Sequence, residues 1–408
     1  MSPITLLIAD HRANIRYRTD GAAARVSPVG PGCPAEHAGL LPLPDGAPHA
    51  ARYAFVDDAA GHLVLGDAES GDLTVSVAIP GEHLAGTPDG RYLAVTTGLG
   101  ANHAPWSDLL TVVDVADLFS VRVRVRAGEP GVVLARDHAT GESVVTVRHR
   151  EPGALEAIAL RDLLRAGPHC PTVRGDIHTD IGDLGHGDAY DPVTGTVFVA
   201  TERGLERFVV DGGRIHALPT VAWPVPGRAY HLRFDPHRRV VAGALRGGPA
   251  DPRAWQDWRN WLFELDVDAL ATRAIEVDSG LVFRPALVDG GMAATTVGRL
   301  AGDRITVWRP DGAATIVTAP LLPMPGAPRP GFPPWDGTAD APAQRRAVAS
   351  DGNRIAVTAG GTGQVEIWAT ADLEDEPTRV RCPTALHEGG QLLWIPVPAP
   401  RVVDTVGR

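Results

Sequence analysis

A short turn rich in Asp, Gly and Pro recurs along the whole chain and constrains its fold more than any other feature. Each turn follows a short apolar run and precedes a segment in which apolar and polar residues alternate. Such alternation predicts a half-buried strand, and Asp-Gly or Pro-Asp-Gly supplies the backbone conformations that a hairpin needs. The eight turns are VDDAAGH (56–62), TPDGRY (87–92), RDHATGES (136–143), YDPVTGTV (190–197), FDPHRRVV (234–241), VDGGMA (288–293), SDGNRIA (350–356) and HEGGQLL (387–393).

The spacing of these turns predicts the architecture. Consecutive turns lie about 30 to 60 residues apart, which is room for four short strands and is the period of one propeller blade. Helical periodicity is weak throughout, and the best candidate, 154–167, is predicted to be a strand followed by a turn. The chain is therefore predicted to be all-β, a single β-propeller of four-stranded antiparallel blades over residues 1–408.

Counting the turns gives eight blades, with seven as the alternative because the first spacing is short. The last turn leaves room for two strands before the chain ends. Two N-terminal segments, ITLLIAD and ANIRYRT, have no such turn before them. We therefore expect the N- and C-terminal strands to share one blade, which closes the ring and removes exposed strand edges.

The segment GEHLAGTPDGRYLAVTTG, with His83 five residues before Pro88-Asp89-Gly90, resembles the repeat of lactonase-type and amine-dehydrogenase-type β-propellers. QVEIWATAD (364–372) is similar to the third strand of a WD-repeat blade, although the Gly-His and Trp-Asp signatures do not recur. The resemblance covers most of the chain as a repeat pattern. It implies a fold and not an activity.

Composition narrows the function. The net charge is −11 and no basic run is present, which argues against nucleic acid and anionic membrane as partners. All 38 basic residues are arginine, so Schiff-base chemistry and a lysine general base are excluded. The three cysteines lie far apart and indicate neither a disulfide framework nor a zinc knuckle. The N-terminal apolar run is too short for a signal peptide, so we expect a cytoplasmic protein.

Histidine and arginine recur about five residues before the turns, where the innermost strand of each blade would begin. Six of the eight such positions carry one of these two residues: Arg52, His83, His186, His231, Arg284 and Arg346. One interpretation is a funnel ringed by imidazole and guanidinium groups, which would attract an anionic small molecule. The other is that these residues bridge neighbouring blades as structural hydrogen-bond donors. Tyr230, His103, Trp106 and His387 are further candidates for ligand binding.

Four long insertions are predicted on the face where the innermost strands begin. They span 98–108, 167–186, 246–261 and 319–344. Loops of this length in a compact domain are usually lids or binding surfaces. The loops 246–261 and 319–344 could alternatively contact a protein partner.

One insertion carries candidate metal ligands. His178, Asp180, Asp183 and His186 could together hold a divalent metal ion, the one cofactor that the sequence brings into consideration. The alternative is a loop rich in Asp and Gly whose side chains cap its own backbone.

A second insertion carries Trp255, Trp258 and Trp261. These side chains could wall a pocket for an aromatic ligand, or one indole face could pack a short helix onto its blade.

Three functions remain open from the sequence. The first is an enzyme of the lyase, lactonase, isomerase or cyclase kind, consistent with bacterial secondary metabolism. In that enzyme His186, His231 and Asp188 would be the acid–base groups, and the arginines would orient an anionic or aromatic substrate. The second is a non-catalytic interaction or ligand-binding propeller. The third is a redox subunit of the amine-dehydrogenase kind, although no CxxCH haem-attachment motif is present.

Overall fold

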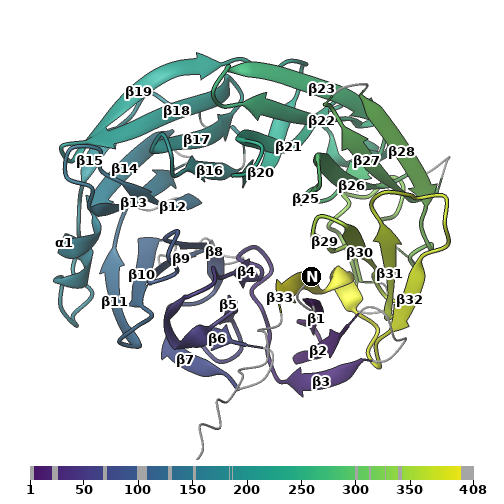
Figure 1. The fold of residues 1–408 in the computed structure, drawn as a ribbon, viewed down its shortest axis with the longest axis horizontal. Coiled ribbons are helices and arrows are strands. Elements are labelled where there is room, and N and C mark those ends of the chain that lie inside the picture. The colour runs from purple at the N-terminus through teal and green to yellow at the C-terminus, as the bar shows by residue number, and fades with distance from the viewer. Residues whose placement is uncertain are drawn as a thin grey trace, which may run out of the picture.

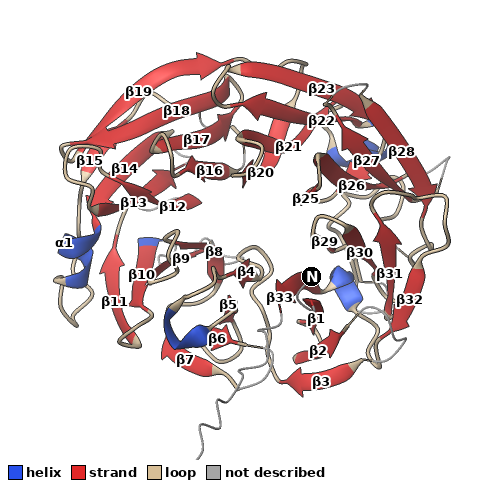
Figure 2. Ribbon diagram, in the orientation of Figure 1, coloured by secondary structure: helices blue, strands red, loops and turns tan. Residues whose placement is uncertain are grey.

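The repeats form eight four-stranded blades arranged in a ring, as the turn count predicts (Figure 1). The computed structural model describes residues 4–20, 26–67, 71–98, 108–126, 131–149, 153–182, 184–185, 187–298, 302–311, 314–326, 328–338 and 342–396. Strands dominate the ring, and the described helices are short (Figure 2). None of these helices has the length and hydropathy that a bilayer span requires.

The two inner positions of each blade, from blade 1 to blade 8, are occupied as follows. The innermost strands are β33 (Gln391–Pro396), β4 (Leu41–Pro42), β8 (Gly81–Gly86), β12 (Gly131–Arg136), β16 (Asp188–Asp191), β20 (Arg228–Asp235), β24 (Leu281–Val282) with β25 (Ala286–Val288), and β29 (Val348–Ser350). The second strands are β1 (Ile4–Asp10), β5 (Tyr53–Asp57), β9 (Tyr92–Thr97), β13 (Ser143–His149), β17 (Thr196–Thr201), β21 (Val240–Gly247), β26 (Gly291–Val297) and β30 (Arg354–Ala359).

The two outer positions complete each blade in the same order. The third strands are β2 (Ile15–Thr19), β6 (His62–Gly66), β10 (Leu109–Asp114), β14 (Ala154–Ala159), β18 (Gly204–Asp211), β22 (Arg259–Asp266), β27 (Arg304–Arg309) and β31 (Gln364–Ala369). The outermost strands are β3 (Ser27–Gly30), β7 (Leu73–Ser76), β11 (Phe119–Arg124), β15 (Asp176–His178), β19 (Arg214–Val221), β23 (Ala271–Val277), β28 (Thr315–Pro320) and β32 (Thr378–Arg381).

The helical segments are short and lie between strands. The segment 154–167 is a strand, β14, followed by the helix α1 (Leu160–Leu164), in agreement with the sequence prediction. The 3₁₀ segments are η1 (Pro48–Ala50), η3 (Pro252–Asp257) and η4 (His387–Gly389).

An aspartate at the start of the turn explains why the repeats fold as hairpins. The Asp191 carboxylate accepts from the backbone N–H of Val193, and Asp235 accepts from those of His237 and Arg238. Asp351 accepts in the same way from Asn353 and Arg354. Such local bonds satisfy backbone donors that the hairpin leaves without strand partners.

Six of the eight predicted turns join an innermost strand to the second strand of its blade, and two do not. VDDAAGH joins β5 to β6, one strand further out, and HEGGQLL leads into β33. The inner hairpin of blade 2 is instead the loop after β4, which contains Pro44-Asp45-Gly46. The blade count is still eight because each of these two blades contributes one of the counted turns.

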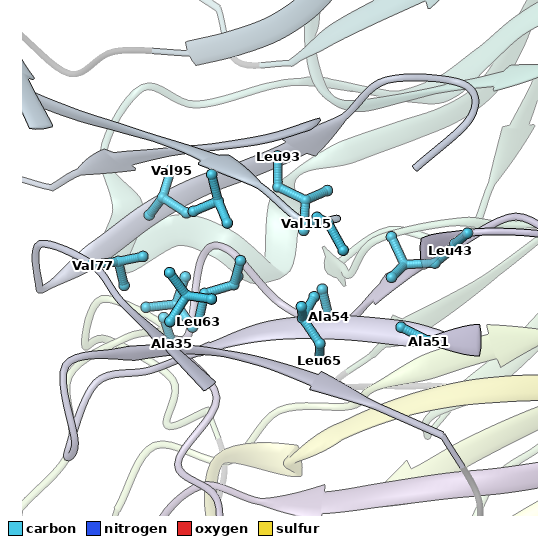
Figure 3. Packing of buried hydrophobic residues seen from close by; sticks show 14 residues of the cluster. Ala35, Leu43, Ala51, Ala54, Leu63, Leu65, Val77, Leu93, Val95 and Val115 are labelled. Atoms are coloured by element: carbon cyan, nitrogen blue, oxygen red, sulfur yellow. The ribbon is translucent and has the colours of Figure 1, made fainter. Parts of the chain in front are cut away.

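The core consists of apolar layers between neighbouring blades. The second and third strands are buried on both faces, whereas outer strands such as β11 alternate between buried and exposed residues. Only the outer strands therefore show the half-buried alternation that the sequence suggested. Figure 3 shows the layer between blades 2 and 3, where Leu63 and Leu65 lie opposite Leu93 and Val95.

One shared blade closes the ring, with three N-terminal strands and a single C-terminal strand instead of the two C-terminal strands expected. The strand β33 pairs antiparallel with β1 and forms the innermost strand of blade 1. Trp394 on β33 is buried against blade 8, and its indole N–H donates to the Ala349 carbonyl at 3.3 Å. The seam therefore combines strand pairing with one large apolar contact.

We expect Trp394→Ala to lower the free energy of unfolding by about 3–5 kcal/mol, because a cavity would open at the closing blade. Chemical denaturation measures the change. Phe119→Ala is the control, because Phe119 is 52% exposed on β11 and should cost less than about 1 kcal/mol. Equal losses in the two variants would show that the closing strand is not a stability determinant.

Candidate functional site in the central funnel

A cavity of about 660 Å³ lies at the mouth of the channel, where the innermost strands begin. Its wall is built by blades 1, 2, 6, 7 and 8, so it spans the seam of the ring (Figure 1). The charged and polar residues of the wall are His11, Glu36, His37, Tyr230, His231, Arg233, Arg284, Arg345, Arg346, Glu388 and Gln391. This is the face on which the sequence predicted a site.

Three members of the predicted ring line this cavity. Tyr230 and His231 lie on β20, and Arg284 follows β24 on the neighbouring blade. His231 adopts a left-handed backbone conformation with φ of 59°, within an irregular register between Tyr230 and Arg233. Strained backbone of this kind occurs disproportionately at functional sites.

Arg346 also borders the cavity but is bound to other groups. Its Nε lies 3.2 Å from Asp303 Oδ2, and its Nη1 donates to the Thr358 carbonyl at 3.1 Å. The side chain is fully buried between blades 7 and 8. Arg346 therefore fits the structural interpretation that the sequence left open.

Two ring residues lie outside the cavity wall. Arg52 immediately precedes β5, a second strand, and pairs with Asp45; its expected position at an innermost strand was wrong because the VDDAAGH turn belongs one strand further out. His83 does lie on the innermost strand β8, but a register shift between Gly81 and His83 changes which residues face the channel.

The remaining acid–base candidates are separated from the funnel or lie outside the described residues. Asp188 Oδ1 accepts from Arg148 Nε at 2.9 Å, and the ion pair is buried between blades 4 and 5. His387, on η4, receives a hydrogen bond from Gln344 and is exposed beside the funnel without lining the cavity. His186, Asp183, His103 and Trp106 lie outside the described residues.

The two described members of the predicted metal site have other partners. The His178 ring lies 5.4 Å from that of Phe208, and Asp180 pairs with Arg203 at 3.0 Å on the surface. Among the residues that the structure describes, no group of three His, Cys, Asp or Glu side chains could hold a metal ion.

The tryptophans of the loop 246–261 pack into the protein. Trp255 and Trp258 are buried with Val297, and Trp258 Nε1 donates to the Pro249 carbonyl at 3.0 Å. Trp261 is buried on β22. The aromatic residue that lines the funnel instead is Trp335 from the loop 319–344, with a relative exposure of 54%.

Several funnel residues were missed from the sequence. Arg233 lies two positions after His231 on β20, and strand alternation would have been the signal for it. Glu36 and His37 precede β4, so recognising the Pro44-Asp45-Gly46 turn as the inner hairpin would have pointed to them. His11, Arg345 and Glu388 lie on connecting segments outside any repeated register, and no sequence signal identified them.

Most charged groups at the mouth are neutralised in pairs. Arg345 pairs with Glu36, and Glu388 accepts from both Arg12 and His11. His37 Nδ1 lies 2.8 Å from Glu82 Oε1. The hydrogen bond from Arg12 lowers the pKa of Glu388 in spite of its partial burial, so this carboxylate is ionised at neutral pH.

Arg233 and Arg284 differ from these pairs, because neither forms an ion pair with any described carboxylate. Burial lowers the pKa of both guanidinium groups, and the neighbouring positive charge of Arg233 helps to lower the pKa of Arg284 to about 10. The Arg284 Nη2 donates to the His37 carbonyl at 2.9 Å, and the nearby Glu82 carboxylate only partly offsets the loss of solvent. Both residues remain charged at neutral pH, so the funnel holds two adjacent cations without counterions.

The fold and the site together define an eight-bladed β-propeller with a basic cavity at the mouth of its channel. No protein-family model matches the chain, and no curated protein matches it in sequence.

Solved structures similar to this chain are propellers of low sequence identity. AztD from Citrobacter koseri aligns with a TM-score of 0.63 and 14% identity over 98% of this chain and 99% of that chain. The dihydro-heme d1 dehydrogenase NirN in complex with DHE aligns with a TM-score of 0.59 and 16% identity, covering 96% of this chain and 74% of NirN. The Dos1 propeller has a TM-score of 0.52 and 10% identity, over 74% of this chain and 73% of that chain. At these identities the likeness concerns the fold.

We expect Arg346→Met to lower the free energy of unfolding by about 3 kcal/mol or more, because it leaves Asp303 and two carbonyl groups without their donor. Denaturant titration of the variant measures the loss. Arg161→Met is the matched control, since the exposed Arg161–Glu142 pair should contribute less than about 1 kcal/mol. An Arg346 variant as stable as the control would contradict the structural role.

Proposed function

We propose that the protein binds a small organic anion in the funnel cavity through Arg233 and Arg284 and catalyses an acid–base reaction on it. The observation that carries the proposal is this pair of adjacent guanidinium groups without ion-pair partners among the described residues. The reaction classes that fit are those expected from the sequence, namely lyase, lactonase, isomerase and cyclase steps.

The energetics of the arginine pair support an anionic ligand. Two like charges in a partly desolvated site repel each other, which is why the Arg284 pKa is lowered. A bound carboxylate or phosphate would reverse both effects, since it supplies the missing counterion and accepts hydrogen bonds in the fork geometry of a guanidinium group. The favourable energy of folding is therefore incomplete until an anion binds.

The remaining wall of the cavity favours an organic anion over an inorganic one. Leu40, Leu281, Phe283, Trp335 and Leu392 present apolar surface beside the two arginines. A ligand with a charged end and an apolar body would contact both parts of the wall.

Imidazole groups supply the acid–base chemistry. His37 is held by Glu82 at Nδ1, so its Nε2 is the ring nitrogen available for proton transfer. Its side chain is 51% exposed, and the residue lines the same cavity as Arg284. His231 lies on the opposite part of the wall, on blade 6. A substrate between them would have one such group on either side.

An open cavity of this volume argues for a small-molecule ligand over a purely protein-binding propeller. The tryptophans of the loop 246–261 are buried in this chain, which weakens the alternative that this loop docks a protein partner. NirN, the neighbour in complex with DHE, is consistent with a propeller of this kind holding an organic ligand, although the likeness of the two chains concerns the fold.

The test is calorimetric titration at low ionic strength with phenyl phosphate and phenylacetate. We expect both to bind, and we expect Arg233→Gln and Arg284→Gln each to weaken binding about tenfold or more, because a charge-assisted hydrogen bond is lost. The melting temperature of these two variants should be unchanged or higher, since each removes an uncompensated charge.

Arg214→Gln is the matched control, because Arg214 is exposed on the outermost strand β19. It should leave binding unchanged. Absence of binding in the unmodified protein would contradict the proposal, as would a loss of stability in the two funnel variants comparable to that of Arg346→Met.

A further inference from the structure

A small side chamber opens from the funnel cavity between blades 6 and 7. It has a volume of about 130 Å³ and shares Tyr230, His231, Val282 and Phe283 with the wall of the funnel. Ala244, Arg246 and Asn260 complete its wall. A ligand in the funnel could therefore extend a substituent into it.

The Asn260 side chain is buried, with an exposed fraction of 1%, and its amide orientation is fixed. Its Nδ2 donates to the carbonyl oxygens of Trp258, Asp278 and Gly280, at 3.4, 3.2 and 2.9 Å. The Oδ1 atom has no hydrogen-bond donor, although it is buried. Because a buried acceptor without a donor costs free energy, the chamber lacks one hydrogen-bond donor.

Arg246 gives the chamber its second polar group. Its guanidinium carbon lies 4.2 Å from the centroid of the Tyr230 ring and 3.9 Å from that of Trp258, and the group donates to the Tyr230 hydroxyl. Burial lowers the pKa of Arg246, and no described carboxylate pairs with it. The chamber therefore combines a fixed cation with an acceptor that needs a donor.

This combination selects among substituents. An ammonium group would satisfy Asn260 but would be repelled by Arg246. A carboxylate would satisfy Arg246 but would be repelled by the Asn260 oxygen. A hydroxyl group satisfies both, because it donates one hydrogen bond and accepts another.

We propose that the side chamber is a specificity subsite for a hydroxyl group, so that the funnel ligand is a hydroxylated organic anion such as a hydroxy acid. The charged end of this ligand contacts Arg233 and Arg284, and its hydroxyl group lies between Arg246 and Asn260. The inference rests on the proposed function, and the experiment separates the two.

The test compares anions that differ by one hydroxyl group, namely phenylacetate with each enantiomer of mandelate, and succinate with each enantiomer of malate. Calorimetric titration should show one hydroxylated member binding about fivefold tighter or more than its parent, the effect of one net hydrogen bond in a buried site. Ala244→Val should abolish this preference by filling the chamber, while the affinity for the parent anion stays within about twofold.

Two further variants keep the result interpretable. Ala250→Val is the matched control, because Ala250 is exposed on the loop after β21 and should leave the preference intact. Asn260→Leu removes the acceptor and should abolish the preference too, but it also removes three hydrogen bonds. The Ala244 variant is therefore the primary one, with its melting temperature measured alongside.

The outcomes are distinct. Binding of parent anions that depends on Arg284, without a hydroxyl preference, would overturn the chamber proposal and leave the proposed function standing. A preference that survives Ala244→Val would also overturn it, since the hydroxyl would then bind elsewhere. Absence of binding by every anion of the series would overturn both.

Discussion

The pairing of β33 with β1 is the interaction on which the rest of the molecule depends. It joins two segments almost 400 residues apart and completes the ring of eight blades. The funnel cavity spans this seam, with walls from blade 1 and from the blades near it on both sides. Without closure, Gln391 and Arg345 would not face Arg284 and His231 across one cavity. The binding site is therefore a property of the closed ring and of no single blade.

Within that ring, charge distinguishes the structural residues from the functional ones. Arg346 is buried with Asp303 and backbone carbonyls, and Arg148 is buried with Asp188. Both satisfy the usual condition for a buried charge, which is a partner of opposite sign with saturated hydrogen bonds. Arg233 and Arg284 do not satisfy it, although the protein as a whole carries a net charge of −11. A surplus of positive charge at the funnel of an acidic protein favours the approach of an anion to that one place.

The sequence was sufficient for the fold because the aspartate turns are local signals. The carboxylates of Asp191, Asp235 and Asp351 bind backbone groups two or three residues away, so the same short pattern recurs wherever the same hairpin forms. Ring closure by the termini also followed from counting strands. The division into three N-terminal strands and one C-terminal strand did not, because β3 has the sequence SPVG and lacks an alternating apolar pattern.

The site was only partly accessible from sequence. His231 and Arg284 were found because they hold a register relative to their turns. Arg52 was misplaced by a turn one strand further out, and His83 lies next to a register irregularity that no residue pattern announces. His37 and Glu388 come from connecting segments, and only the closed ring brings them to the cavity. Whether a buried arginine has a carboxylate partner depends on residues distant in the chain, such as Asp303 for Arg346. That property, which separates Arg346 from Arg284, cannot be read from a repeat.

Anomalous diffraction from crystals soaked in selenate tests the central claim most directly, because it locates an anion without assuming the identity of the natural ligand. The account predicts a selenium peak within hydrogen-bond distance of both Arg233 and Arg284, and its disappearance in crystals of the Arg284→Gln variant. A funnel without such a peak, or an experimental structure in which carboxylates already neutralise both guanidinium groups, would contradict the account.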